Sequence, residues 1–488
     1  MEGFLMKNNH HSFKYNLLYS SLLLACAFPY HAWAGATFDG TMDSGSTASL
    51  SGNFTVTEAD GSLRGTNLFH SFSDFNIHSG ESATFTGTSA INNVISRVTG
   101  SEDTTINGQL TSTITGADFY FINPNGILFK EGASINVDGS FYASTADYVR
   151  FGDESTFSAS NTTTSSLTSS PPSSFGFLSN SPADISLQGA QLIKGFNLLQ
   201  PDNASFSLIA GNITLDQAAE DTVTQYGGSY SKGSFIHTGN DRFEIISVAS
   251  SGEVVSTVDG YDLSSFTELG DVSIVNGSVI DSTDVYIRGG NVTIENSIIA
   301  PGFFYLPYFY SSLSNPYGLN ILGPFPTPTE GSQIVAPNGG NIDISATNQV
   351  NIIGNSPLII PVLYPGFEYL GLQMLPRPNF ENYVAGITTY GGNPLTPLVG
   401  APATDVTNIN INTSNVLVSG NAGIISERYG AGLAGNINIA TNTLDVQTGG
   451  LIANVNTFYG AGGNITIDAQ QVTLASDPDS DMLTGIIS

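Results

Sequence analysis

Residues that could perform chemistry are few and widely spaced in this chain of 488 residues. Beyond the first 34 residues only His70, His78 and His237 remain as histidines, and no His-Glu-x-x-His pattern places two of them on one helix face. No Gly-x-Ser-x-Gly turn presents a serine as a nucleophile, and Cys26 is the only thiol. The sequence therefore predicts no metal site, no cofactor and no covalent hydrolase.

Carboxylates beside a cation are the second kind of group that could act on a substrate. Parallel β-helices host many enzymes that cleave polysaccharides, and these enzymes need several carboxylates near a cation. Only two local pairings stand out, Asp241 with Arg242 and Asp284 with Arg288, and we interpret them as surface ion pairs. We therefore predict that the protein is not an enzyme. A secreted β-helix polysaccharide lyase or hydrolase is the alternative.

The charge of the chain limits its partners. Lys and Arg number 12 against 41 Asp and Glu, which gives a formal net charge of −29 and an isoelectric point of about 4.1. Binding to nucleic acid or anionic lipid needs clustered cations, so neither partner is expected. The 54 glycines and the lack of a helical charge pattern indicate a β-rich chain dense in turns.

The N-terminus has the layout of a secretory signal peptide. Lys7 and Lys14 precede an apolar stretch, residues 17–28, and a small-x-small site ends at Ala34. We predict a signal peptide over residues 1–34, cleavage between Ala34 and Gly35, and a mature protein that is secreted or displayed at the cell surface. No later run reaches the roughly 18 apolar residues of a membrane span, so none is expected.

Cys26 lies inside this predicted signal peptide, so the mature chain would hold no disulfide and no thiolate metal site. Leu23 to Cys26 also loosely resembles a lipobox, which would make Cys26 a lipidated N-terminus instead. The site that ends at Ala34 favours ordinary cleavage, and lipidation of Cys26 is the alternative.

Short strands and tight turns alternate in the stretch from Asp118 to Phe151. Residues 119–122 form a short β-prone run, and Asn123-Pro124-Asn125-Gly126 follows it as a turn, because Pro cannot donate to a ladder and Asn-Gly supplies positive φ. Further short strands are predicted at residues 127–129 and 134–137. Strands this short, without helices between them, fit the faces and corners of a β-solenoid.

At these residues a family resemblance becomes specific. INPNGILF, followed by GSFYASTADYVRFGD, resembles the signature of the filamentous haemagglutinin N-terminal domain, the secretion domain of two-partner secretion exoproteins. Four further blocks stand in the same order: NLFHSFSDFNI from Asn67, NVISRVTG from Asn93, FGFLSNSPADISLQGA from Phe175 and RFEIISVASSGEV from Arg242. A second Asn-Pro-Asn-Leu motif found in many members is missing, since residues 85–90 read FTGTSA.

The resemblance implies a function and a set of site residues. An outer-membrane β-barrel transporter would recognise the N-terminal domain in the periplasm and export the unfolded chain, which would then serve adhesion to a host-cell, bacterial or glycan ligand. Export of a longer toxin is the alternative to adhesion. The transporter-recognition motif would be Asn123, Pro124, Asn125 and Gly126, with Asn93, Arg97, Val98, Thr99 and Gly100 as a second block.

A repeat occupies the second half of the chain. A turn of the Gly-Asn type followed by apolar-polar-apolar begins at Thr407, Gly435 and Gly463, with 28 residues between successive starts. A repeat of this length without helix predicts one coil of a parallel β-helix, with alternate residues facing inward. The Asn that precedes each strand predicts a ladder of side-chain hydrogen bonds from coil to coil. The candidates are Asn212, Asn291, Asn341, Asn408, Asn436 and Asn464.

These observations predict an all-β protein built as a right-handed parallel β-helix with an N-terminal cap and loops outside the helix. The signal peptide occupies residues 1–34 and the secretion domain residues 35–300. Residues 301–405 are coils interrupted by aromatic and Pro-rich excursions, and residues 406–488 are regular coils that end in mid-coil. The low-complexity stretch from residue 161 to residue 174 is predicted to be an exposed loop or a flexible excursion and not a coil.

Overall fold

Residues from Ala34 onward form one compact unit in the computed structural model. The described residues are 35–194, 204–218, 222–225, 228–231, 233–258, 260–299, 340–355, 385–391, 407–428, 432–456, 460–477 and 483–488. The predicted signal peptide with Cys26 and Ala34 lies outside them, as do the aromatic excursion at residues 303–328 and most of the one at 357–402.

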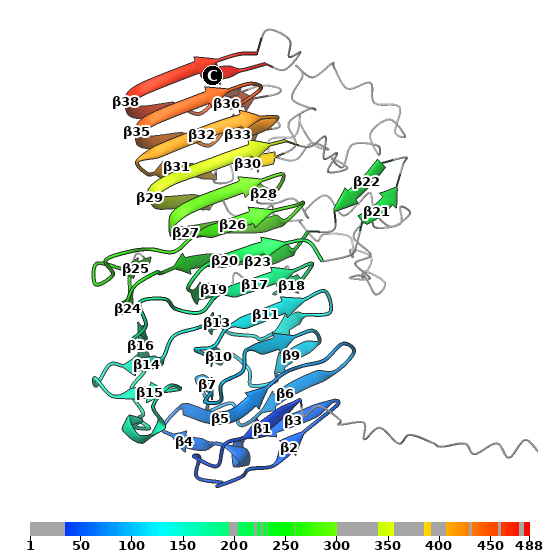
Figure 1. Cartoon of the computed structure of the whole chain (residues 1–488), viewed down its shortest axis with the longest axis vertical. Helices are drawn as coiled ribbons and strands as arrows, with labels where there is room; N and C mark the ends of the chain where they lie inside the picture. The colour runs from blue at the N-terminus through cyan, green and yellow to red at the C-terminus, as the bar shows by residue number, and fades with distance from the viewer. Residues whose placement is uncertain are drawn as a thin grey trace, which may run out of the picture. The chain divides into compact units, whose positions relative to one another are not determined.

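Apart from two short 3-10 turns, the regular secondary structure of the described residues is all strand, and the strands wind into stacked coils (Figure 1). The strand pairings give each coil three faces. One coil consists of β10 (Asp118–Ile122), β11 (Ile127–Lys130) and β12 (Ser134–Asn136), with a turn after each strand. The next strand, β13 (Phe141–Ser144), returns to pair in parallel with β10. This return defines a parallel β-helix and confirms the predicted fold class, while its right hand stays a prediction.

Each face is a ladder of parallel strands from successive coils, and the longest strands bend around corners to serve more than one face. Face 1 contains β5 (Asn67–Phe75), β7 (Asn93–Val98), β10, β13, β19 (Ser205–Ala210), β23 (Phe235–Ser247), β27 (Val279–Glu295), β29 (Asn341–Gly354), β31 (Asn408–Asn412), β35 (Ile437–Gln447) and β38 (Ile465–Ala475). Face 2 contains β8 (Thr104–Ile106), β11, β17 (Ile185–Gln188), β20 (Ile213–Asp216), β26 (Val272–Val275) and β32 (Asn415–Gly420), with parts of β27, β29, β35 and β38.

Face 3 consists of two sets of strands. The first is the four-stranded sheet β3 (Phe54–Thr57), β6 (Ser82–Thr86), β9 (Gln109–Ser112) and β12. The second contains β18 (Gln191–Ile193), parts of β23 and β27, β28 (Ile298–Ile299), β30 (Ala385–Gly391), β33 (Ala422–Arg428), β36 (Leu451–Asn456) and β39 (Gly485–Ile487). Two small pairs lie apart from these three faces, β21 (Thr222–Gln225) with β22 (Gly228–Ser231) and β34 (Gly432–Leu433) with β37 (Gly460–Ala461).

Antiparallel strands close the first coil. β1 (Ala36–Phe38) pairs antiparallel with β2 (Ser49–Leu50) and with β5, and β4 (Ser62–Arg64) also pairs antiparallel with β5. The short 3-10 helix η1 (Glu58–Asp60) connects β3 to β4. These pairings cover strand edges that the first coil would otherwise expose, as an N-terminal cap must.

A separate five-stranded antiparallel sheet forms from two excursions that leave the helix at different coils. The first supplies β14 (Tyr148–Phe151), β15 (Thr156–Ser158) and β16 (Pro172–Phe177), and the second supplies β24 (Gly252–Thr257) and β25 (Gly260–Asp262). β16 and β24 join the two excursions across the sheet. We call it the outer sheet, because its apolar side chains pack on outward-facing residues of face 1.

The prediction of an exposed loop over residues 161–174 is wrong at the C-terminal end of that stretch. Thr162–Thr164 form a 3-10 turn, η2, and residues 172–174 belong to β16. Pro172 is compatible with a strand because it is the first residue of β16. Distant pairing with β14 and β24, which no local pattern reveals, holds this end of the stretch in place.

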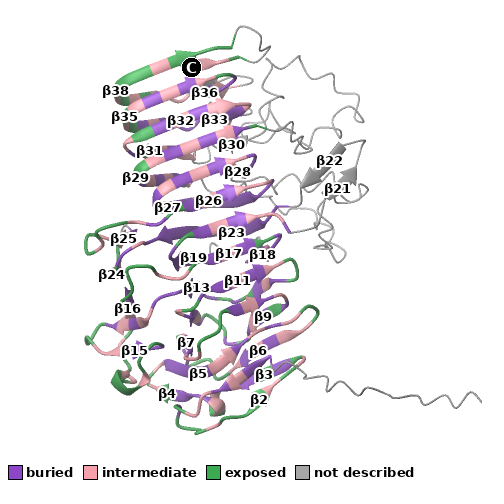
Figure 2. Cartoon of the chain, viewed as in Figure 1, coloured by how far each residue is buried: buried purple, intermediate pink, exposed green. Residues whose placement is uncertain are grey.

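Alternate residues of each strand point inward and stack in columns. Ile437 lies opposite Ile465 and Ile439 opposite Ile467, as the 28-residue repeat predicted. Figure 2 shows the same alternation of buried and less buried residues along the strands of successive coils. The inward columns of all coils form one continuous apolar cluster.

The predicted asparagine ladder exists ahead of face 1. Asn436 N donates to Asn408 Oδ1 at 2.9 Å, and Asn464 N donates to Asn436 Oδ1 at 2.9 Å. Asn408 Nδ2 reaches Asn341 Oδ1 at 3.4 Å. The side chains of Asn408 and Asn436 thus satisfy the backbone of the next coil where that coil turns a corner.

The two remaining candidates belong to a second ladder, which lies ahead of face 2. Asp271 N donates to Asn212 Oδ1 at 2.9 Å, and Asn291 Nδ2 donates to Asp271 Oδ1 at 2.6 Å. Asn212 N in turn donates to Asp184 Oδ1 at 2.7 Å. Asp and Asn alternate here because either side chain offers the oxygen that the next backbone N–H needs.

Candidate functional site

The Asn-Pro-Asn-Gly sequence is the turn that carries the chain from β10 on face 1 to β11 on face 2. Gly126 N donates to Asn123 O at 3.2 Å, which closes a four-residue turn. Asn123 Oδ1 accepts from both the backbone N and the Nδ2 of Asn125, each at 3.0 Å. Pro124 fixes its own φ, and Gly126 adopts a φ of +123°, which side chains rarely allow. The four residues therefore suit this turn by their backbone preferences.

Side chains of the turn also bind the coil that precedes it. Asn123 Nδ2 donates to Glu102 O at 3.1 Å and to Thr104 Oγ1 at 3.0 Å. Asn125 Nδ2 donates to Gly100 O at 2.8 Å. Asn123 is fully buried, whereas Asn125 is exposed. Asn123 therefore stabilises the turn from inside, and Asn125 is the exposed residue of the motif.

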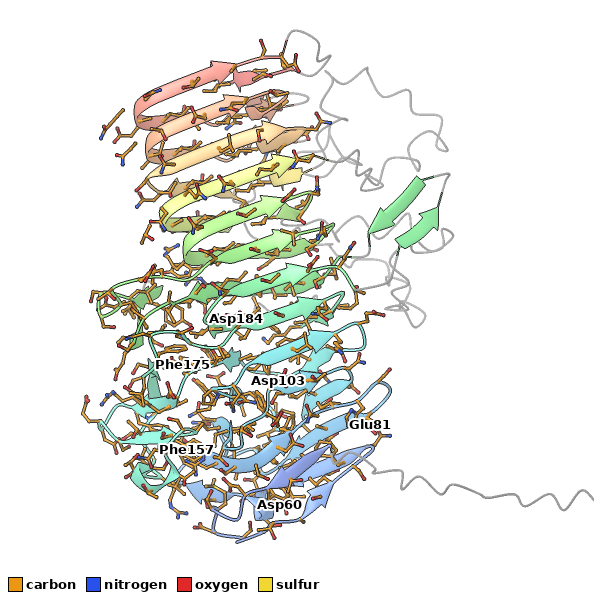
Figure 3. The ribbon with its side chains drawn as sticks, in the orientation of Figure 1. Asp60, Glu81, Asp103, Phe157, Phe175 and Asp184 are labelled. Atoms are coloured by element: carbon orange, nitrogen blue, oxygen red, sulfur yellow. The ribbon has the colours of Figure 1, made fainter. Side chains whose placement is uncertain are left out.

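Gly126 lies between the turns of the coils on either side, which Figure 3 marks with Asp103 and Asp184. A Cβ on Gly126 would lie 3.4 Å from Asp184 O and 3.6 Å from Asp103 Cβ, so its φ, and not lack of space, requires Gly. Thr104 N donates to Gly126 O at 3.0 Å, and Ile127 N donates to Asp184 O at 3.2 Å. The motif therefore bonds to both neighbouring coils.

The second predicted block, Asn93 to Gly100, lies on the coil directly before the turn. β7 pairs in parallel with β10 along its length. Gly100, just after β7, accepts the bond from Asn125 and lies so close to β5 that a Cβ would approach Ser73 O to 2.1 Å. Val98 faces the apolar interior and is 1% exposed. The structure thus brings the two sequence blocks together.

Asn93 connects its coil to the segment that leads into the outer sheet. Its Nδ2 donates to Asn67 Oδ1 at 2.8 Å on the preceding coil. Asn67 Nδ2 then donates to Thr168 O at 3.0 Å and to Ser170 O at 2.7 Å. Two amides therefore hold the segment before β16 against face 1.

Arg97 joins three parts of the domain through one buried guanidinium, which is 1% exposed. Its Nε donates to Ser71 Oγ on β5 at 2.8 Å, and its Nη2 donates to Thr41 Oγ1 in the cap at 3.0 Å. Its Nη1 donates to Ser158 O and Ser165 Oγ, both at 2.5 Å, at the edge of the outer sheet. The cap, the first coils and the outer sheet therefore depend on this one side chain.

The surroundings of Arg97 shift its pKa without removing its charge at neutral pH. Burial lowers the pKa of Arg97 to about 10, and the charge of Asp39 opposes that effect. The Phe157 ring, labelled in Figure 3, lies 4.1 Å from the guanidinium carbon. Burial raises the pKa of Asp39, but hydrogen bonds from Ser71, Thr41 and Thr99 outweigh burial and hold it below its ordinary value.

Thr99 completes this network beneath Arg97. Its Oγ1 donates to Asp39 Oδ2 at 2.9 Å and lies 3.1 Å from Phe72 O. Ser71 Oγ donates to the same Asp39 oxygen at 2.5 Å. Sequence reasoning missed Asp39 and Ser71, because single Asp and Ser residues in a Ser-rich cap carry no spacing pattern.

The expected pair of Asp241 with Arg242 is wrong. Asp241 is buried and pairs with Lys194, and Arg242 Nε lies 3.3 Å from Glu244 Oε1. Adjacent residues of a strand point to opposite sides, so neither can reach the other. The ion-pair partners of these residues lie instead on a neighbouring coil or two positions along the same strand, where the side chain points to the same face.

The expected pair of Asp284 with Arg288 is wrong for a related reason. Arg288 Nη1 lies 3.0 Å from Asp343 Oδ1 on the following coil. Four residues along a strand span roughly 13 Å, whereas neighbouring strands are under 5 Å apart. The Tyr286 ring lies 3.6 Å from the Arg288 guanidinium carbon and accompanies the pair.

Two searches of the described residues bear on other kinds of site. No group of three His, Cys, Asp or Glu side chains gathers there in a way that could hold a metal ion. No helix among those residues is long and apolar enough to cross a membrane.

Fold and site together define a class of protein, a parallel β-helix with a capped N-terminal end whose two motif blocks brace consecutive coils. The model of the TPS secretion domain matches residues 34–302, more than half of the chain. The chain therefore belongs to this family, the secretion domains of two-partner secretion exoproteins.

Two solved structures are similar to this chain. The crystal structure of a filamentous hemagglutinin secretion domain is 10% identical with a TM-score of 0.30, covering 83% of this chain and 90% of that chain. The HMW1 secretion domain from Haemophilus influenzae is 14% identical with a TM-score of 0.31, covering 86% of this chain and 96% of that chain. A search of curated proteins finds no match.

Proposed function

We propose that residues 35–300 are recognised in the periplasm by an outer-membrane β-barrel transporter, which exports the chain to the cell surface or the medium. The carrying observation is the position of the two motif blocks inside the family match, on consecutive coils joined by the bond from Asn125 to Gly100. A signal peptide over residues 1–34, cleaved between Ala34 and Gly35, would deliver the chain to the periplasm.

Burial decides how the motif acts in this proposal. Of the nine motif residues, only Asn125 is exposed, while Asn123 and Arg97 are fully enclosed. A transporter that meets the folded domain can touch Asn125 and the exposed parts of the four half-buried residues, Asn93, Thr99, Gly100 and Pro124. The four buried residues, Arg97, Val98, Asn123 and Gly126, therefore act by shaping the first coils, and changes at them reduce export through the stability of the domain.

The test compares three substitutions in cells that carry the cognate transporter. Asn123→Ala leaves Thr104 Oγ1 and Glu102 O without their donor, so we expect a loss of roughly 3 kcal/mol and a several-fold fall in exported protein. Asn136→Ala, at an exposed position on β12, is the matched control and keeps export unchanged. Immunoblots of medium and periplasm give the readout.

Asn125→Ala distinguishes a direct contact with the transporter from an effect on the shape of the turn. Reduced export with an unchanged unfolding curve assigns Asn125 to direct contact with the transporter, and export that follows stability assigns it to the shape of the turn. Full export of both Asn123→Ala and Asn125→Ala would overturn the role of the motif.

After export, we propose that the chain serves adhesion to a host-cell, bacterial or glycan ligand, without catalytic activity. The regular coils of β31 to β38 present short polar side chains on face 1, which suits a displayed surface. Binding of the exported chain to cultured cells or glycan arrays tests adhesion. Cleavage of polyuronates by the culture supernatant would instead favour the polysaccharide lyase.

A further inference from the structure

A buried Lys and a buried Asp meet where the chain passes from face 3 to face 1. Lys194 follows β18, and Asp241 lies within β23 on the next coil. Their side chains are 2% and 4% exposed, and Lys194 Nζ donates to Asp241 Oδ2. A buried ion pair gains little net stability, because both groups lose their hydration. Stability alone therefore does not account for the burial of this pair, and we consider whether the two groups react with each other.

The backbone holds both groups in place. Lys194 N donates to His237 O at 2.8 Å. Asp241 O accepts from Thr238 Oγ1 at 2.8 Å and from Ser282 Oγ at 2.9 Å. Asp241 Oδ1 also accepts from a backbone N–H, that of Ala204, at 3.3 Å. The amine is thus kept against the carboxyl group, as a reaction between them requires.

We propose that Lys194 and Asp241 condense into an isopeptide bond once these coils have folded. One proton passes from the ammonium to the Asp241 carboxylate, and the neutral Nζ then attacks Cγ. The C–N bond forms as the nitrogen passes one proton to the departing hydroxyl. The C–O bond breaks and water leaves. No oxidant or reductant is needed, since an ammonium and a carboxylate become an amide and water.

This bond would be a covalent brace in a chain that has no cysteine after Cys26. It would join residues 47 apart in sequence and lock two consecutive coils together. Closing such a loop stabilises a fold largely by restricting the unfolded chain, as a disulfide does. The inference goes beyond the proposed export function and does not depend on it.

Mass spectrometry of the folded full chain tests the proposal directly. We expect an intact mass lower by one water, and a branched peptide after proteolysis that contains both Lys194 and Asp241. Recovery of the two residues in separate, unmodified peptides would show a plain ion pair and overturn the proposal. This measurement needs no variant, so it stands even if substitutions here prevent folding.

Variants then test each chemical role, with circular dichroism as the check on folding. Lys194→Arg keeps the ion pair but has no competent nucleophile, so it should retain its full mass. Asp241→Asn should lose ammonia instead of water and reach the same product mass as the wild type. A mass loss in Lys194→Arg would contradict the assignment of the amine.

Discussion

The coils before residue 250 and those after residue 340 fill their interiors with different side chains. The earlier coils stack phenylalanines, whose rings meet at angles that differ from pair to pair, 78° for Phe85 with Phe119 and 20° for Phe119 with Phe141. The later coils place Ile, Val and Leu in regular columns. Aromatic packing of this kind is specific to each position, whereas the columns repeat with the coil.

The outer surfaces of the two regions differ in the same way. The early part of face 1 lies under the outer sheet, where Phe175 packs 6.1 Å from Tyr120 and 6.0 Å from Tyr142. Later coils leave face 1 uncovered by that sheet and carry the asparagine ladder instead. Contacts in the first region join residues far apart in sequence, while those in the second join neighbouring coils. The loss of stability caused by a substitution should therefore extend across the first region but stay within neighbouring coils in the second.

The largest effect is expected from Arg97→Ala. Loss of the guanidinium removes four hydrogen bonds and the contact with Phe157, so we expect roughly 4 kcal/mol of destabilisation. Hydrogen exchange resolved by peptide should rise together in the cap, in β5 and in the outer sheet. Faster exchange confined to β7 would contradict the idea that this region unfolds as one unit.

Ile439→Ala also truncates a buried side chain, but in the later coils. The side chain is 2% exposed in a column between Ile411 and Ile467, and its truncation leaves a cavity worth about 3 kcal/mol. Exchange should rise in β31, β35 and β38 and stay unchanged in the outer sheet. Spread of the effect to β10 would show that the two regions are coupled.

The pH dependence of His70 sharpens the comparison, because no histidine follows His237 in the sequence. Burial lowers the pKa of His70 to about 4, from an ordinary value near 6.5. Between these values the unfolded chain binds a proton that the folded chain excludes, so stability falls as the pH drops through this window. The full loss is about 3 kcal/mol, and most of it is present by pH 5.

Urea unfolding at pH 7 and at pH 5 measures this loss, with exchange in β3, β5 and β6 as the local readout. His70→Leu removes the titrating group and should flatten the slope between the two pH values. An equal slope in His70→Leu would assign the acid sensitivity to other groups.

The sequence predicted the later coils better than the region of the outer sheet. The 28-residue spacing and the alternation around Ile437 and Ile439 are local patterns, and they predicted the later coils with their register. The Asn-Pro-Asn-Gly turn was predictable because each residue has a backbone preference that the turn uses. The outer sheet and the hydrogen bonds of Arg97 join segments up to 105 residues apart, so no short window of sequence contains their signal. The same reason explains the wrong partners predicted for Asp241 and Arg288.

The smallest effect is expected from Asn436→Ala in the ladder of the later coils. Its Oδ1 accepts from Asn464 N at 2.9 Å, and its Nδ2 donates to Asn408 Oδ1 at 3.2 Å. Both bonds lie near solvent, where water replaces a lost partner, so we expect a loss of about 1 kcal/mol. Faster exchange at residues 464 and 465 alone is the expected result, and Asn436→Asp, which keeps the acceptor, should restore most of the protection. A loss as large as that of Arg97→Ala would mean that the ladder, and not the apolar columns, holds the later coils together.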